Sequence, residues 1–322
     1  MGTKRKPKTR KRNKTGKRLL FSVLVVSLLF ALFLVFTPGT EPLAATGDTN
    51  LPEGIELPVP VPGEQIIRHT GYTLSYDEPY EVASYVAYQL TKDEVNGGLN
   101  RADDFRADPM VATGSATLND YKGSGYDRGH LIPAADQKWS TEAMSDSFYM
   151  SNMTPQVGSF NRGIWGSLEA VVRTFANDNG AVYVVTGPVL TDGPYKTIGK
   201  NKVAVPKRFY KVVLFYDGKT AKAIGFLLPN EGSNKPVETF AVPVDEVEQV
   251  TGLDFYPALP DNIEESVEAS FDPSAWDWKE FTPGDEPKTA VNGREENDKT
   301  EALTRLWADE MRRRFSSFFR SL

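Results

Sequence analysis

Hydrophobic residues follow three different patterns along this chain. Residues 19–36 form one apolar run of 18 residues, in which only Ser22 and Ser27 are polar. Between about residues 66 and 281, apolar positions come in short segments, some alternating with polar positions and some recurring every three or four residues. Residues 301–322 again place apolar side chains at spacings of three and four. These patterns predict a helix of membrane length, a globular domain and a terminal amphipathic helix.

The central segment combines strand and helix patterns. Runs rich in β-branched and aromatic residues predict strands at residues 72–76, 84–90, 181–186, 209–216 and 221–228. The Asp217-Gly218 pair between the last two is a hairpin signal. Helical spacing predicts helices at residues 141–149, capped by Ser140, at 163–176 and near 244–251. Hairpins mixed with helices favour an α+β fold with a mixed, largely antiparallel sheet over a doubly wound parallel one.

Charge around the apolar run sets its expected orientation. The first 18 residues contain ten Lys or Arg and no acidic residue, and since the total net charge is -6, the rest of the chain carries -16. Positive flanks stay on the cytoplasmic side, so we expect a basic cytoplasmic segment at 1–18 and a transmembrane helix or signal anchor at 19–36. The protein would then be a single-pass protein of the cell membrane with its domain outside. Cleavage near residues 43–45, which would secrete the domain, is the alternative.

Three other segments flank the predicted domain at residues 66–281. Residues 37–65 are rich in Pro and Gly and predict an exposed tether. Residues 282–299 form a polar linker, and residues 300–322 an amphipathic helix with clustered arginines. Such a helix either docks on the domain or a partner, or lies in a membrane interface.

Composition limits the chemistry. The chain has no cysteine and only two histidines, His69 and His130. This excludes disulfides, thiolate metal sites, cysteine nucleophiles and cages of several histidines. A metal site would rest mainly on oxygen ligands, which suit magnesium, calcium or manganese. His69 lies in a polar stretch before the first predicted strand, and we expect it at the surface.

Candidate catalytic residues gather downstream of residue 123. His130 follows Asp127, Arg128 and Gly129, and its near-neutral ordinary pKa suits proton transfer. Arg128 has the side chain best shaped to clamp a phosphate. Further on, oxygen-bearing side chains that suit a hard cation accumulate at Asn152, Gln156, Asn161 and Glu169. The alternative role of Asn161 is that of an N-cap for the helix at 163–176.

Residues 126–169 resemble the core of the DNA/RNA non-specific endonucleases, which include the mitochondrial endonuclease G type and secreted bacterial nucleases. The family's Asp-Arg-Gly-His motif stands at residues 127–130, and the ordered match continues through 151–156 to Asn161, Trp165 and Glu169. A looser resemblance extends from about residue 71 to 256. The resemblance implies a ββα-metal nuclease core that hydrolyses DNA, RNA or both with little sequence specificity.

The resemblance also implies a role for each matched residue. His130 would be the general base, Asn161 the direct protein ligand of Mg²⁺, with Mn²⁺ as a substitute, and Glu169 would hold a water of the metal. Asn152 would orient the site. Arg128 would contact phosphate together with Arg101 or Arg106, which the sequence does not separate because both flank Asp103-Asp104. Gly163 stands where relatives often carry an amide. The expected partners are nucleic acid and the membrane, and a homodimer is among the expected assemblies.

Two other functions fit the same residues. One is a catalytically silent, membrane-tethered protein that binds nucleic acid or cell wall, and the other is a phosphodiesterase for a different phosphate ester. Retention of His130, Asn161 and Glu169 argues against the silent protein. A plasmid-nicking assay with and without magnesium separates the three.

Overall fold

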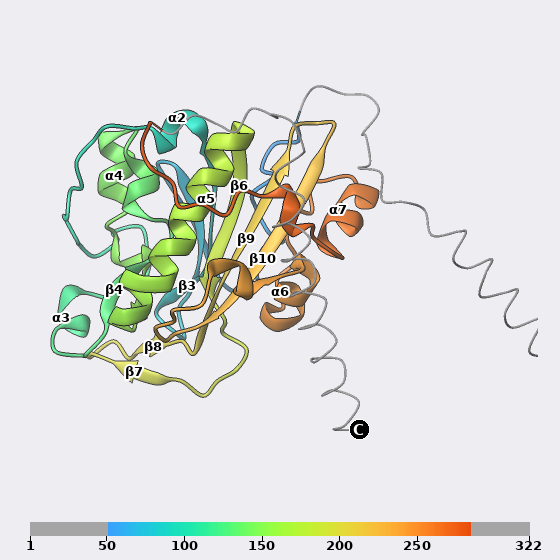
Figure 1. Ribbon diagram of the computed structural model, residues 1–322. Coiled ribbons are helices and arrows are strands. Elements are labelled where there is room, and N and C mark those ends of the chain that lie inside the picture. The colour runs from blue at the N-terminus through green and yellow to red at the C-terminus, as the bar shows by residue number, and fades with distance from the viewer. Residues whose placement is uncertain (1–50, 285–322) are drawn as a thin grey trace, which may run out of the picture. The chain divides into compact units, whose positions relative to one another are not determined.

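A seven-stranded antiparallel sheet forms the centre of the domain in the computed structural model, which describes residues 51–284. Its strand order is β1-β2-β3-β6-β9-β10-β11, and every neighbouring pair runs antiparallel (Figure 1). The strands are β1 (Gln65–His69), β2 (Tyr72–Asp77), β3 (Val82–Thr91), β6 (Ala181–Pro188), β9 (Arg208–Tyr216), β10 (Ala221–Pro229) and β11 (Ala241–Val242). The predicted α+β class with a largely antiparallel sheet is confirmed.

Helices cover both faces of the sheet. Helix α5 (Gly166–Asn179) packs on one face, where it shares a hydrophobic core with alternate residues of β9 such as Val213. Helices α6 (Val244–Thr251) and α7 (Asp261–Glu268) pack on the opposite face, against the intervening residues of β9 such as Val212. Because side chains alternate along a strand, each sheet face has its own core.

Local sequence signals explain the longest elements. The Asp217-Gly218 turn joins β9 to β10 as predicted, with Gly218 at φ 85° and the Asp217 carboxylate accepting from the backbone N–H groups of Lys219 and Thr220. Helix α5 buries apolar residues at helical spacing and ends before Gly180, whose φ is 84°. It begins three residues later than predicted, after a π-helical segment, η3 (Phe160–Trp165), that is kinked at Gly163.

Shorter elements build the edge of the domain beside α5. Two small antiparallel pairs consist of β4 (Asp127–His130) with β5 (Met153–Gln156) and β7 (Lys196–Ile198) with β8 (Val203–Val205). The remaining helical segments are α2 (Lys92–Val95), α3 (Leu118–Tyr121), η1 (Ala134–Gln137), α4 (Thr141–Asp146), η2 (Met150–Asn152), η4 (Val237–Phe240) and η5 (Pro273–Ala275). Ser140 caps α4 as predicted, since its hydroxyl accepts from the Ala143 N–H at 3.3 Å.

The predicted boundary between the tether at residues 37–65 and the domain lies too late in the sequence, because the end of this segment already belongs to the domain. Ile55 is 1% exposed and belongs to the core beneath α6 and α7, and the Val59 N–H donates to the Asp254 carbonyl at 3.0 Å. Gln65 already belongs to β1. The Pro-rich composition was misleading because a few apolar side chains of this stretch are buried in the domain. Residues 37–50 lie outside the described part.

Membrane attachment concerns residues that the structure does not describe. Within residues 51–284 no helix is both long and apolar enough to cross a bilayer. The predicted basic segment at 1–18 and span at 19–36 lie outside that range, as do the helix at 300–322 and most of the linker at 282–299.

Candidate active site

The β4-β5 pair presents His130 at the end of a short strand. Gly129 of β4 faces Thr154 of β5, and the Gln156 side chain lies directly over it. A Cβ at position 129 would stand 2.1 Å from Cδ of Gln156, so only glycine fits there. The glycine of the motif therefore has a packing reason, which is to let a buried amide side chain cover the strand.

The His130 imidazole is enclosed by two aromatic rings. Its ring centre lies 5.0 Å from that of Phe148 and 5.7 Å from that of Phe105, both edge to face. The residue is 8% exposed, and Nε2 has no hydrogen-bond partner among the described residues. Burial, assisted by the positive charges of Arg101 and Arg128, lowers the pKa of His130 to about 3. The imidazole is therefore neutral at physiological pH and has a nitrogen free to accept a proton.

Arg128 and Arg101 stack on the same two rings. The Arg128 Cζ lies 4.0 Å from the centre of the Phe105 ring, and the Arg101 Cζ lies 4.7 Å from that of Phe148. Within the described residues Arg128 forms no ion pair, and Arg101 pairs with the exposed Asp103 alone. Both guanidinium groups thus lie beside His130 and can bind an anion there.

Arg106 is used differently. Its Cζ lies 3.8 Å from the centre of the Tyr149 ring, and Nη1 donates to the Asp104 carboxylate at 3.0 Å and to the Ser145 carbonyl at 2.8 Å. Nη2 also lies 3.6 Å from Asp146. These contacts tie the segment before β4 to α4. Of the two arginines that the sequence left open, Arg101 is the one whose charge acts on His130.

Asn161 lies in the π-helical segment η3 and is tied to the strand that ends in His130. Its Nδ2 donates to Oδ2 of Asp127 at 2.9 Å, and Arg162 donates to the same oxygen. Since a carboxylate oxygen only accepts, this contact fixes the orientation of the amide. No donor among the described residues contacts Oδ1. The N-cap alternative is wrong, because no Asn161 side-chain bond caps α5, whose N-cap residue is Trp165.

Glu169 projects from the first turn of α5 into a group of buried charges. Arg173, one turn later, pairs with Asp136 at 2.9 Å, and the Tyr88 hydroxyl donates to Asp136 at 3.0 Å. Burial raises the pKa of Glu169 to about 7, while the positive charges of Lys211 and Arg173 act to lower it. Arg101 acts on Glu169 as well as on His130, which links the two groups electrostatically.

Lys211 adds a buried positive charge to this group, and no functional role was expected for it from the sequence. It is fully buried in β9, with Nζ 4.9 Å from the centre of a Trp165 ring and no hydrogen-bond partner in the described part of the chain. Burial lowers its pKa to about 8, while Glu169 and Asp136 act to raise it. It supplies Glu169 with a buried counter-charge. A charged residue inside the apolar run FYKVVLFY was the available signal.

Asn152 supports the site from behind. It is fully buried, Nδ2 donates to the carbonyls of Ile132 and Ser147 at 3.1 and 2.8 Å, and Oδ1 accepts from the Ile132 N–H at 3.0 Å. These bonds hold the chain just after His130. The bonds to the protein occupy both ends of the amide, which suits the orienting role that the resemblance implies for Asn152.

His69 is not a surface residue. Its side chain is 3% exposed, Nε2 lies 2.8 Å from Asp108 Oδ2, and the ring stacks on Tyr149 with centres 4.7 Å apart. The prediction was wrong because burial came from residues distant in sequence. The His69 ring packs on Tyr149, and Arg106 stacks on the same tyrosine, so His69 helps to hold Tyr149 in place beneath Arg106.

Comparison with known proteins gives consistent results. The family model of the DNA/RNA non-specific endonucleases matches residues 53–262. Human mitochondrial endonuclease G is 40% identical over 209 residues, which cover 61% of this chain and 70% of the human protein. A nuclease of Nostoc sp. is 36% identical over 223 residues, covering 66% of this chain and 80% of its own length. A crystal structure of an EndoG/EndoGI complex superposes with a TM-score of 0.59 at 34% identity, covering 64% of this chain and 90% of that one.

Proposed function

The chain belongs to the DNA/RNA non-specific endonuclease family and is therefore an endonuclease, and on this basis we propose that His130 is its general base and Asn161 the ligand of a catalytic divalent cation. The observation that carries the proposal is the buried, neutral imidazole with Nε2 unpaired, flanked by two guanidinium groups. A proton acceptor beside two anion-binding groups suits phosphodiester hydrolysis.

The protein groups divide the work as follows. Arg128 and Arg101 bind the non-bridging oxygens of the phosphate, and Nε2 of His130 takes a proton from the attacking water. The new bond joins the water oxygen to phosphorus, the bond from phosphorus to the 3′-oxygen breaks, and the departing 3′-oxygen takes a proton from solvent. The products then carry a 5′-phosphate and a 3′-hydroxyl. Asn152 keeps the chain after His130 in place, and Lys211 balances the charge of Glu169.

The residues present fit a hard divalent cation. Contact with Asp127 orients the Asn161 amide so that Oδ1, an oxygen donor, is the atom left for a ligand. Glu169 adds a half-buried carboxyl group that would hold water of the cation. When bound, Mg²⁺ or Mn²⁺ would neutralise negative charge that develops on the phosphate and on the departing oxygen.

Nicking of supercoiled plasmid by the full-length chain tests the proposal. We expect nicking with magnesium, loss of nicking in excess chelator and recovery when magnesium returns, with a similar response on RNA. A silent binding protein would retard plasmid in a gel without cutting it, and an esterase of other specificity would cleave a small phosphodiester but leave plasmid intact. Either result would contradict the proposal.

The pH dependence should differ between free enzyme and complex. In the free enzyme burial and two arginines keep the pKa of His130 near 3, so His130 stays an available base well below the ordinary value of 6.5. Bound phosphate adds negative charge beside the ring and raises that pKa. Because kcat/KM reports the free enzyme and kcat the complex, the acid limb of kcat should lie at higher pH. Steady-state profiles on a short duplex test this, and coinciding acid limbs at or above 6.5 would refute it.

Arg101 and Arg106 should respond differently to substitution. Arg101→Ala removes one charged contact to phosphate and should lower kcat/KM by about 10-fold to 100-fold, since hydrogen bonds to charged groups are worth ~1.5–3 kcal/mol. It should also reduce the salt slope of DNA binding by about 1. Arg106→Ala serves as the matched variant, with lower thermal stability and a wild-type salt slope. The reverse pattern would assign the phosphate contact to Arg106.

A further inference from the structure

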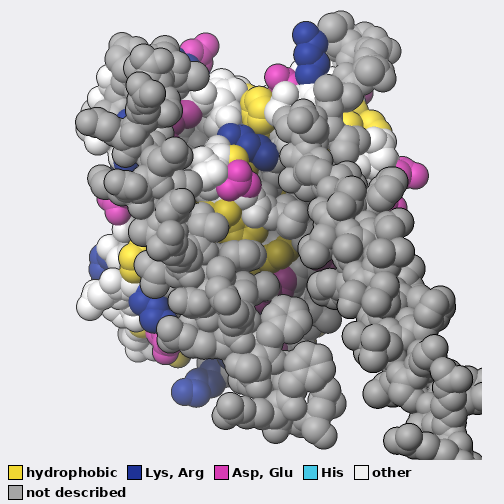
Figure 2. Space-filling model, turned by 45° about the vertical axis from the view of Figure 1, so that its right-hand side comes forward, with side chains coloured by type: hydrophobic (Ala, Val, Ile, Leu, Met, Phe, Trp, Pro, Cys, Tyr) yellow, Lys and Arg dark blue, Asp and Glu magenta, His cyan; other side chains and the backbone are white. Residues whose placement is uncertain are grey.

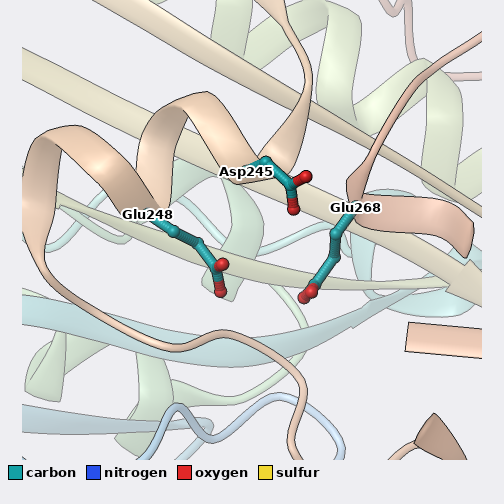
Figure 3. A group of neighbouring side chains, drawn as sticks. All are labelled: Asp245, Glu248 and Glu268. Carbon is teal, nitrogen blue, oxygen red and sulfur yellow. The ribbon is translucent and has the colours of Figure 1, made fainter. Parts of the chain in front are cut away.

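Three carboxylates converge on the sheet face opposite to the candidate active site. Asp245 and Glu248 come from α6 and Glu268 from the last turn of α7, and one oxygen of each lies within 4.8 Å of the others (Figure 3). Both helices pack on the core that contains Val212. His130 is followed by Leu131, which belongs to the other core. The group of three carboxylates, which we call the α6-α7 acidic site, is therefore separate from the catalytic residues.

Glu268 distinguishes this group from an ordinary acidic surface. The residue is 6% exposed, its Oε1 is buried without a hydrogen-bond donor, and Figure 3 shows its carboxylate directed toward Glu248. A buried carboxylate without a donor is unfavourable unless a cation or a proton compensates it. None of the three acids forms an ion pair with a Lys or Arg of the described chain, although they lie close together.

Neighbouring contacts leave oxygens available for an ion. Glu248 uses Oε1 to accept from the Phe255 N–H at 2.8 Å, which fixes the side chain and leaves Oε2 free. Asp245 is exposed and gives solvent access to the site.

We propose that the α6-α7 acidic site binds a structural Ca²⁺ ion, which joins α6 to α7 through Asp245, Glu248 and Glu268. Oxygens about 2.4 Å from an ion stand up to about 4.8 Å apart, which suits calcium. Magnesium needs shorter, octahedral bonds and keeps much of its water. The ion would also fix the segment between the helices, where Tyr256 adopts a φ of 56°. The proposal is independent of the catalytic role assigned to His130 and Asn161.

Thermal unfolding of the full-length chain in detergent tests this site. After removal of divalent ions, an excess of calcium should raise Tm by roughly 5 °C in the wild type, because an ion bound only to the folded state stabilises it. Glu268→Gln should abolish most of this shift. Glu265→Gln, an exposed change on the same helix, should retain it. Any calcium at the catalytic residues contributes equally to all three proteins and cancels in the comparison.

Two further measurements complete the test, and magnesium serves as the comparison ion in the thermal unfolding. Asp245→Asn, a change at an exposed position, should weaken calcium binding about 10-fold, as measured by calorimetry. This variant also tests the site if Glu268→Gln fails to fold. Magnesium-dependent plasmid nicking should remain unchanged in Glu268→Gln. Equal calcium shifts in wild type and Glu268→Gln, or a magnesium shift as large as that of calcium, would overturn the proposal.

Discussion

Replacing His130 by alanine is expected to lower the rate of plasmid nicking by about 10²–10⁴-fold, the usual contribution of a general base. The reason is that Nε2 of His130 is the unpaired acceptor between the two arginines, while the other histidine is engaged with Asp108. The rate should be measured at saturating substrate and magnesium, with far-ultraviolet circular dichroism to show that the variant is folded.

His69→Gln is the matched control for this variant. It also removes a buried imidazole, and it breaks a contact to Asp108, so it should lower Tm. Its kcat should stay near that of the wild type because the ring stacks behind Arg106 and not on Phe105 or Phe148. A His130→Ala protein that cuts at the wild-type rate would remove the base from the mechanism.

Asn161→Ala should produce the second large effect, a loss of at least about 10²-fold in nicking rate at a fixed magnesium concentration. The change removes Oδ1, the oxygen that the contact with Asp127 leaves free. More magnesium should then be needed for half-maximal activity, and a titration of the ion measures this shift.

Arg162→Ala provides the comparison for Asn161. Arg162 donates to the same Asp127 oxygen but contributes no oxygen ligand, so its removal should leave the magnesium requirement unchanged. An Asn161→Ala protein with a wild-type magnesium requirement would show that Asn161 does not hold the ion. A loss of activity in both variants without a shift in magnesium requirement would instead assign Asn161 to the support of Asp127.

Sequence patterns predicted the parts of the fold that rest on local signals. The β9-β10 hairpin follows from Asp217-Gly218, and α5 follows from its apolar spacing. The small strands β7 and β8, three residues each, have no periodicity long enough to detect. Ile55 could not be predicted as buried, because the core that it joins is built from residues distant in sequence, such as Tyr183 and Val247.

The site residues likewise fall into those that the sequence could identify and those that it could not. The motif at residues 127–130 and the residues that follow it were recognisable because their order is specific. The sequence could not decide whether Arg101 or Arg106 contacts phosphate. That choice depends on which aromatic ring each guanidinium group stacks on. The burial of His69 and Lys211 likewise depends on distant residues, Asp108 for the first and Trp165 for the second.

The stacking of Arg128 on Phe105 bears on how fast a polyanion can be captured. A guanidinium held by a carboxylate must exchange that partner before it meets phosphate, and this exchange adds reorganisation energy to binding. Arg128 is held by an uncharged ring and keeps its full charge for an incoming ligand. On the face shown in Figure 2, the visible Lys and Arg side chains lie among Asp and Glu side chains. Because the chain carries a net negative charge, its long-range attraction for a nucleic acid is weak. Capture therefore depends on close encounters between the phosphate backbone and the positively charged Arg128 side chain.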